Sequence, residues 1–150
     1  MNIRKLAPHE QPPMELLLLA DPSPALVAEY IGRGQCFVGE RNGRTIGVYV
    51  LLPTRPETLE LVNVAVAEDE QGSGNGKRLV THAVETAKAL GYRTIEVGTG
   101  STGVAQLALY QKCGFRMTGI DRDFFTRHYE EAIYENGILL RDMVRLAQDL

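Results

Sequence analysis

Apolar and polar positions follow two clear patterns in the middle of the chain. Residues 58 to 66 form a β-branched and apolar run, which is typical of a central strand. Residues 77 to 90 instead repeat with helical spacing, and their apolar stripe consists of Leu79, Val80, Ala83, Val84, Ala87 and Leu90. His82 falls on the polar stripe of this helix, so we expect it at the solvent.

A second short strand follows the predicted helix. Gly91 is expected to end the helix in a left-handed conformation, and residues 94 to 97 form a short apolar run. Strand, helix and strand together predict a β-α-β unit over residues 58 to 97, with a right-handed crossover.

Turn and breaker residues place the remaining elements. We expect a strand at 1–5, helices at 14–20 and from 23 or 24 to 30, and strands at 35–40 and 45–52 joined by an Asn42-Gly43 turn. Residues 53–57 should form a loop. A helix at 103–113 should stop at Gly114, with strands at 115–120 and 138–146. We expect one α/β domain over residues 1–150, with a mixed, mostly antiparallel sheet and about four helices.

The segment Gln71-Gly72-Ser73-Gly74-Asn75-Gly76 lies between the predicted strand and helix. The first turn of a helix has unpaired N–H groups and about half a positive charge, and glycines let an anion approach the backbone. The segment therefore predicts a pyrophosphate site, with a flexible surface turn as the alternative. A P-loop would need Gly at 71 and Ser or Thr at 78, and a dinucleotide fingerprint would need Gly at 77. The residues there are Gln71, Arg78 and Lys77, so both motifs are excluded.

The same segment resembles the Gln-x-x-Gly-x-Gly motif of the GNAT N-acetyltransferase superfamily. Leu109-Tyr110-Gln111-Lys112-Cys113-Gly114-Phe115 is similar to that family's Leu-Tyr-x-Lys-x-Gly-Phe signature, in the same order along the chain. The resemblance implies acetyl-CoA as cosubstrate, bound in a gap where a bulged strand at 58–66 splays from the strand at 94–97. The implied cofactor-binding residues are Val64, Ala65, Val66, Gln71, Gly72, Ser73, Gly74, Asn75, Gly76, Lys77 and Ser101.

One position departs from the family pattern. Many members have an asparagine near the start of the second helix, whereas this chain has Gly100-Ser101-Thr102-Gly103. We expect Ser101 or Thr102 to replace it, as helix cap and as hydrogen-bonding group for the cofactor.

Tyr110 and Glu60 are the candidate catalytic residues. Tyr110 would be the general acid, since a phenol keeps its proton until a thiolate develops beside it; the alternative is a core aromatic residue. Glu60 would be the base, because some branches of the superfamily place a glutamate there and an apolar strand should raise its pKa. Strand alternation places Glu60, Val62, Val64 and Val66 on one side of the strand unless the bulge shifts them. The alternative for Glu60 is that this side faces solvent and not the active site.

Charge and cysteine content limit the partners. The formal net charge is −3 over 150 residues without a basic stripe, so we expect no nucleic-acid partner. The N-terminus lacks the apolar run of a signal peptide, residues 16–20 are too short to span a bilayer, and Cys36 and Cys113 are far apart. These features predict a cytoplasmic protein without a membrane segment. His9 and His128 have no second ligand at metal spacing, so we expect no metal.

The acceptor is the open part of the sequence interpretation. Residues 121–137 mix carboxylates with aromatic side chains, which could form an amine-binding wall, a homodimer surface or a packed hairpin. We expect an N-acetyltransferase that moves an acetyl group to a primary amine by direct attack in a ternary complex, with a small-molecule amine favoured over a protein. The alternatives are a non-catalytic CoA-binding module on the same fold and, more remotely, a nucleoside-triphosphate-binding protein.

Overall fold

Seven strands form the main sheet, in the spatial order β1-β2-β3-β4-β5-β9-β6. The computed structural model describes all residues from 1 to 150. Neighbouring strands are antiparallel except β4 and β5, which are parallel, so the predicted mixed sheet and β-α-β unit are confirmed. The strands are β1 (Asn2–Lys5), β2 (Gln35–Arg41), β3 (Arg44–Arg55), β4 (Thr58–Val66), β5 (Thr94–Gly100), β6 (Arg116–Asp121) and β9 (Met143–Asp149).

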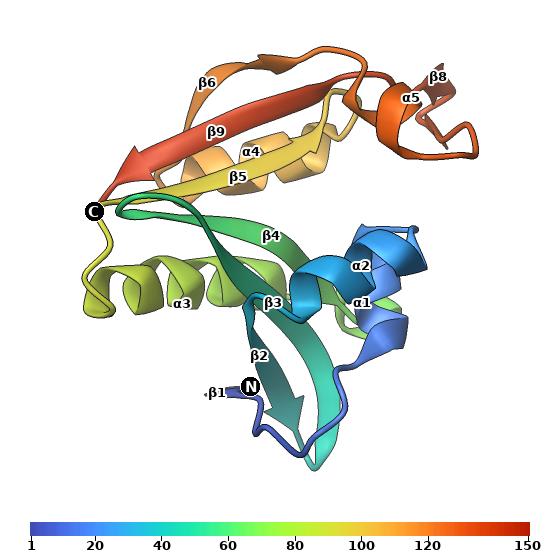
Figure 1. The fold of residues 1–150 in the computed structure, drawn as a ribbon. Coiled ribbons are helices and arrows are strands. Elements are labelled where there is room, and N and C mark those ends of the chain that lie inside the picture. Colours follow the sequence, from blue (N-terminus) through green and yellow to red (C-terminus); the bar gives the residue numbers. More distant parts are fainter.

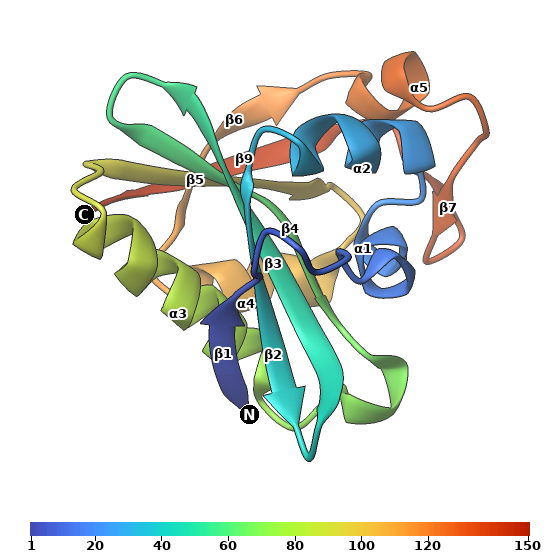
Figure 2. The same cartoon turned by 60° about the horizontal axis from the view of Figure 1, so that its bottom comes forward.

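Helices cover both faces of this sheet (Figures 1 and 2). On one face α3 (Asn75–Ala89) and α4 (Val104–Lys112) bury a core cluster with β4 and β5. On the other face α1 (Met14–Ala20) and α2 (Pro24–Ile31) bury a second cluster. The 3-10 turn η1 (Glu68–Glu70) precedes α3, while α5 (Phe124–His128) and the small hairpin of β7 (Tyr134–Glu135) and β8 (Ile138–Leu139) follow β6.

The turn and cap residues act as expected. Ser23 caps α2 by accepting a hydrogen bond from the Leu26 N–H at 3.2 Å. Asn42 and Gly43 both have positive φ, as a two-residue hairpin turn requires. Gly91 follows α3 with a φ of 87°, where a residue with a Cβ atom would be strained.

Two predicted boundaries were wrong. β3 continues through Arg55, although residues 53–57 were expected to form a loop. β2 begins at Gln35, opposite Leu51, so Pro53 lies where β3 has a partner on one side only and a missing N–H is tolerated. The predicted strand 138–146 is broken at 140–142. Its first two residues pair with β7 through a turn at Asn136 and Gly137, and only the later ones join the main sheet.

His82 is half-buried, and the prediction of a solvated surface histidine was wrong. Its Nδ1 lies 2.7 Å from the hydroxyl of Tyr49 on β3, a side chain that is fully buried. Tyr49 also approaches the hydroxyl of Thr86 at 3.1 Å. A buried tyrosine needs a partner for its hydroxyl, and α3 supplies it from what looked like its polar stripe. At the end of the apolar stripe, Leu90 is exposed because it lies at the C-cap.

A bulge in β4 determines which side chains face each core. Val50 lies opposite Asn63 and Leu51 lies opposite Leu61, so Val62 is the extra residue. Before the bulge Leu59 and Leu61 pack in the α3–α4 core, and after it Val64 and Val66 pack against that same core. The alternation is therefore reversed, and Glu60 does not share its side with Val64 and Val66. Pairing of β4 with β5 covers only Thr58–Leu61, so the expected splay is confirmed.

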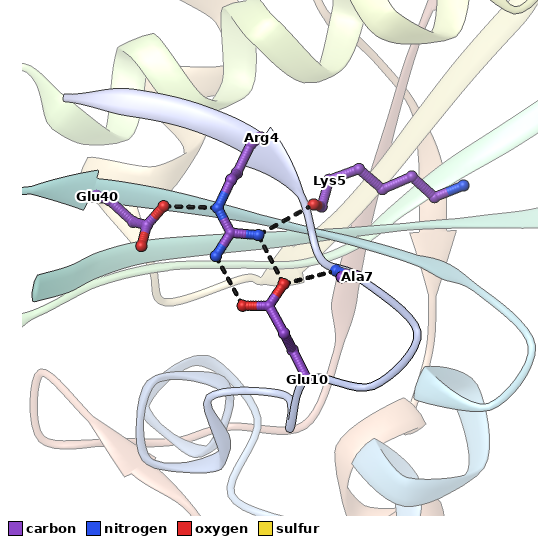
Figure 3. A network of polar contacts seen from close by, with 5 residues as sticks. All are labelled: Arg4, Lys5, Ala7, Glu10 and Glu40. Carbon is purple, nitrogen blue, oxygen red and sulfur yellow. Dashed lines mark hydrogen bonds and ion pairs between the residues drawn. The ribbon is translucent and has the colours of Figure 1, made fainter. Parts of the chain in front are cut away.

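Arg4 fixes the connection that leads from β1 to α1 (Figure 3). Its guanidinium donates two hydrogen bonds of 2.7 Å to the Glu10 carboxylate and one of 2.6 Å to Glu40 on β2. Glu10 also accepts the N–H of Ala7 at 2.8 Å. The first part of the loop between β1 and α1 is thereby held against the sheet. The hydrogen bonds from Arg4, and to a smaller extent the one from the Ala7 N–H, lower the pKa of Glu10 to about 2.

This lowered pKa predicts an acid-dependent loss of stability. A carboxyl group whose pKa is lower in the folded chain stabilises the fold above its ordinary pKa of 4.5, and the contribution disappears as the pH falls towards 2. Glu10→Gln should lower the melting temperature at pH 7 and make it fall less between pH 4.5 and 2, as followed by circular dichroism. Glu15→Gln is the control, since Glu15 is exposed and forms no ion pair. Equal pH dependence in wild type and Glu10→Gln would contradict this account.

Candidate functional site

A cavity of about 610 Å³ lies where β4 and β5 separate. Residues 61–66 of β4 and 98–100 of β5 line it, together with α4, the glycine-rich turn and the connection between α1 and α2. Past Leu61 and Val97 the two strands no longer pair with each other, while each still pairs on its other side with β3 or β9. The facing backbone groups of both strands are therefore available to an extended ligand, which could pair with them as an added strand does.

The glycine-rich turn leaves a row of backbone donors without acceptors. None of the N–H groups from Gly72 to Lys77 has a hydrogen-bond partner in the protein, and the first helical bond is from Arg78 to the carbonyl of Gly74. Gly72 and Gly74 have φ values of 82° and 86°, which only glycine adopts without strain. The row lies at the N-terminus of the 15-residue helix α3, whose dipole adds positive potential. The arrangement suits a phosphate or pyrophosphate group.

Two polar side chains of the turn hold its shape. Gln71 donates from Nε2 to the carbonyl of Val66 at 2.9 Å, which ties the turn to the end of β4. Asn75 is 2% exposed and donates to the Glu70 carbonyl at 3.0 Å, while its Oδ1 accepts a hydrogen bond from Arg41 at 3.3 Å. Since both groups of the Asn75 side chain are engaged, its backbone N–H is the group that remains free for a ligand.

The predicted cofactor-binding residues fall into two sets. Six of them line the cavity: Val64, Ala65, Val66, Gln71, Gly72 and Gly76. The other five lie outside the cavity lining: Ser73, Gly74, Asn75, Lys77 and Ser101. Ser73, Gly74, Asn75 and Lys77 belong to the row of free N–H groups at its edge.

The start of α4 differs from what we expected. Its N-cap is Gly103, and no side chain caps the helix. Ser101 is exposed, and its N–H donates to the Asp142 carbonyl at 3.0 Å. Thr102 is buried, and its hydroxyl donates to Glu135 on β7 at 2.8 Å. The capping role predicted for Ser101 or Thr102 was therefore wrong, because the chain turns into α4 two residues later than a Ser101 cap would require.

Tyr110 lies on α4 and lines the cavity. Its side chain is 5% exposed and packs edge to face on Phe115, at 5.9 Å between ring centroids. The hydroxyl forms no hydrogen bond within the protein, yet it is not among the buried unpartnered atoms, so it reaches the cavity. Burial, with a smaller effect from Cys113, raises the pKa of Tyr110 to about 12. At neutral pH this phenol is a protonated donor beside a cavity.

Glu60 lies beside the cavity and does not line it. It is paired at 3.5 Å with Arg145 of β9, which also approaches Asp121 at 3.5 Å. Burial raises the pKa of Glu60, and the positive charge of Arg145 only partly opposes this. Because of the bulge, Glu60 lies on the same side of the sheet as Asn63. Burial raises the pKa of Tyr30, and the charge of Glu60 adds a smaller effect in the same direction.

A buried polar network that sequence reasoning missed forms another wall of the cavity. Asp21, in the turn between α1 and α2, accepts hydrogen bonds from the hydroxyls of Tyr30 at 3.1 Å and Tyr129 at 2.9 Å. Asn63 at the bulge donates to Tyr30 at 2.8 Å and to the Leu17 carbonyl at 3.0 Å. Asp21, Asn63 and Tyr129 all line the cavity. A polar Asn63 within an apolar strand was the available sequence signal.

The segment 121–137 contributes part of this wall. Phe125 and Tyr129 line the cavity with ring centroids 5.5 Å apart, whereas Tyr134 is exposed. Phe124 lies beside the Arg145 guanidinium, at 5.7 Å from ring centroid to Cζ.

No group of three or more His, Cys, Asp or Glu side chains in the protein could hold a metal ion. No helix is long and apolar enough to cross a membrane.

Comparison with known proteins places the chain in a family. Residues 4–115 match the model of the acetyltransferase (GNAT) family. The chain is 59% identical over 136 residues to the uncharacterized N-acetyltransferase YvbK of Bacillus subtilis, and the match covers 91% of this chain and 88% of that protein.

Two solved structures extend the match to the whole fold. The IAA acetyltransferase from Bacillus cereus superposes with a TM-score of 0.96 at 58% identity, over 99% of both chains. A GNAT family acetyltransferase from Elizabethkingia anophelis with acetyl-CoA bound superposes with a TM-score of 0.97 at 42% identity, over 99% of this chain and 97% of that one. The separated strands, the free N–H row and these matches lead to one conclusion: this chain belongs to the GNAT acetyltransferase family.

Proposed function

We propose that this protein transfers the acetyl group of acetyl-CoA to a primary amine, with both substrates bound at once. The observation that carries the proposal is the cavity between β4 and β5, which is bordered by the free N–H row of residues 72–77 and by the Tyr110 hydroxyl. The acetyl-CoA bound to the Elizabethkingia relative supports acetyl-CoA as the cosubstrate. The alternative of a non-catalytic CoA-binding module has no such support, and it predicts binding without turnover.

The cofactor would use backbone groups more than side chains. The free N–H groups from Gly72 to Lys77 would hold its pyrophosphate, and the side chain of Gln71 would keep the turn closed on β4. The unpaired edges of β4 at Val64–Val66 and of β5 would bind the pantetheine arm. Ser101 lies outside the cavity and outside the N–H row, so of the predicted cofactor-binding residues it has the least support from the structure.

Tyr110 would supply the proton that the reaction needs at sulfur. The amine nitrogen forms a bond to the thioester carbonyl carbon, the carbon–sulfur bond breaks, and the thiolate accepts the Tyr110 proton. The amine releases its own proton to a base. A pKa of about 12 keeps Tyr110 protonated at neutral pH, so its hydroxyl is available to hydrogen-bond the departing sulfur and to donate its proton as the carbon–sulfur bond breaks.

Glu60 is the proposed base, and it would act through water because it does not line the cavity. Its raised pKa suits a group that must take a proton near neutral pH. Its ion pair with Arg145 is the competing, purely structural role.

The setting of this activity is also a proposal. We infer one N-acetyltransferase domain over residues 1–150, supported by the single continuous main sheet. The two unpaired thiols of Cys36 and Cys113 support a cytoplasmic location. A small-molecule amine remains the favoured acceptor over a protein amine, and a homodimer is the assembly to test by light scattering. The Bacillus cereus relative is named for IAA, so IAA belongs in the acceptor panel.

Tyr110→Phe tests the acid. It should lower kcat about a hundredfold or more, the usual size of a general-acid contribution, while CoA affinity stays within about twofold. Thiol release from acetyl-CoA with an active amine measures the rate, and calorimetry measures the affinity. Tyr92→Phe is the control, because it removes a tyrosine hydroxyl outside the cavity. Unchanged turnover in Tyr110→Phe would remove Tyr110 from the mechanism.

Gly74→Ala tests the N–H row. A Cβ atom at this positive φ costs about 1–2 kcal/mol and should rotate the donors away, lowering acetyl-CoA affinity about tenfold. Gly43→Ala is a matched control in the β2–β3 turn, with positive φ and equally open space. Both variants should lose similar melting temperature, and only Gly74→Ala should lose affinity in calorimetry. Equal affinity in the two variants would refute the pyrophosphate role.

Glu60→Gln tests the base. A carboxylate with a raised pKa should make kcat rise with pH around a midpoint above the ordinary 4.5. This rise should disappear in Glu60→Gln, and kcat should fall. The ionisation of the amine itself is common to both enzymes, so their profiles with one acceptor can be compared directly. An unchanged profile would leave Glu60 as the structural partner of Arg145.

A further inference from the structure

The charges that line the cavity have one sign. Its lining includes the carboxylates of Asp21 and Glu135 and no Lys, Arg or His side chain. Asp21 is 9% exposed, and no basic side chain forms an ion pair with it or with Glu135. A buried carboxylate without a positive partner is costly, and a cation bound in the cavity would offset that cost.

Hydrogen bonds hold the Asp21 carboxylate in place. The hydroxyl of Tyr30 donates to its Oδ2 and the hydroxyl of Tyr129 to its Oδ1, and the Ser23 N–H donates to Oδ1 at 3.2 Å. These bonds are made by neutral donors, so the negative charge remains. Glu135 comes from β7 in the segment that follows α5 and is held by the hydroxyl of Thr102. The two carboxylates therefore reach the cavity from separate, fixed walls.

The partners of Asn63 fix the orientation of its side chain beside Asp21. The Leu17 carbonyl can only accept, and the Tyr30 hydroxyl already donates to Asp21, so the Asn63 nitrogen must face both of them. This orientation leaves Asn63 Oδ1 as the one buried side-chain polar atom of the protein without a partner. Asn63 is 4% exposed and lines the cavity beside Asp21. An unsatisfied acceptor of this kind costs about 1–3 kcal/mol. The oxygen is covered by its neighbours, so it is not part of the cation site that the cavity offers.

An amine held against these carboxylates is a poor nucleophile. A neighbouring carboxylate favours the charged form of an amine and raises its pKa, whereas acetyl transfer needs the neutral form. We propose, on the basis of the function proposed above, that the acceptor carries at least two amino groups. One reacts at the thioester, and another stays protonated beside the carboxylate of Asp21 or Glu135. The rings of Phe125 and Tyr129 add aromatic faces for this ammonium group.

The same lining disfavours acceptors with a carboxylate. No basic side chain in the cavity would neutralise such a group, and it would be repelled by Asp21 and Glu135. Diamines and polyamines are therefore expected to react better than monoamines, and monoamines better than amino acids of the same length.

Three amines of matched length test the proposal: 1,4-diaminobutane, butylamine and 4-aminobutanoate. In the thiol-release assay the wild type should show kcat/KM at least about tenfold higher for the diamine than for butylamine, and lowest for the amino acid. Glu135→Gln and Asp21→Asn should each reduce the diamine preference several-fold, because KM should rise more for the diamine than for butylamine. Glu131→Gln is the charge-matched control, since Glu131 is exposed and outside the cavity.

The outcomes separate the two proposals. Turnover with butylamine or 4-aminobutanoate at least as good as with the diamine would overturn the two-amine acceptor and leave the acetyltransferase intact. A diamine preference that survives in both variants would also overturn the role of the carboxylates. Should Asp21→Asn fail to fold, Glu135→Gln still decides. Acetyl-CoA binding without thiol release for any amine would refute the proposed function, and the acceptor proposal with it.

Discussion

The whole site depends on one extra residue in β4. Val62 interrupts the register with β3, and immediately before it the pairing of β4 with β5 ends. A regular strand would have continued to hydrogen-bond with its parallel neighbour and closed the sheet. β3 and β9 pair with the outer sides of the two strands and hold each of them in place along the gap. The cavity is thus a property of the sheet itself.

The bulge also decides what surrounds the gap. It turns Val64 and Val66 towards the α3–α4 core and presents Asn63 to α1 and α2. The proposed cofactor site, which uses backbone groups, and the polar wall proposed to bind the acceptor amine can therefore lie on opposite sides of β4. Asn63, Tyr30, Asp21 and Tyr129 join α1, α2 and the end of α5 around it, so the polar wall is fixed by tertiary contacts.

Much of the fold could be predicted because its signals are local. The strand at 58–66, α3, the Asn42-Gly43 turn and the Gly91 cap each depend on a few adjacent residues. The glycine-rich turn and the Tyr110 signature identified the family for the same reason. His82, Glu60 and Thr102 were harder, since their roles depend on Tyr49, Arg145 and Glu135, which are distant in sequence. Asp21 lies in the turn between α1 and α2, and only the folded chain brings it beside Tyr129.

The position of β9 has a consequence for how the molecule is made. β9 is synthesised after both β5 and β6, yet it lies between them in the sheet and pairs with both. Until it emerges from the ribosome, one edge of β5 is unpaired and β6 has no place in the sheet. The glycine-rich turn, α3 and the β4 bulge can all be present on the nascent chain by then. The gap between β4 and β5 has a fixed far wall only when β9 is paired with β5, so the site depends on residues from both halves of the chain.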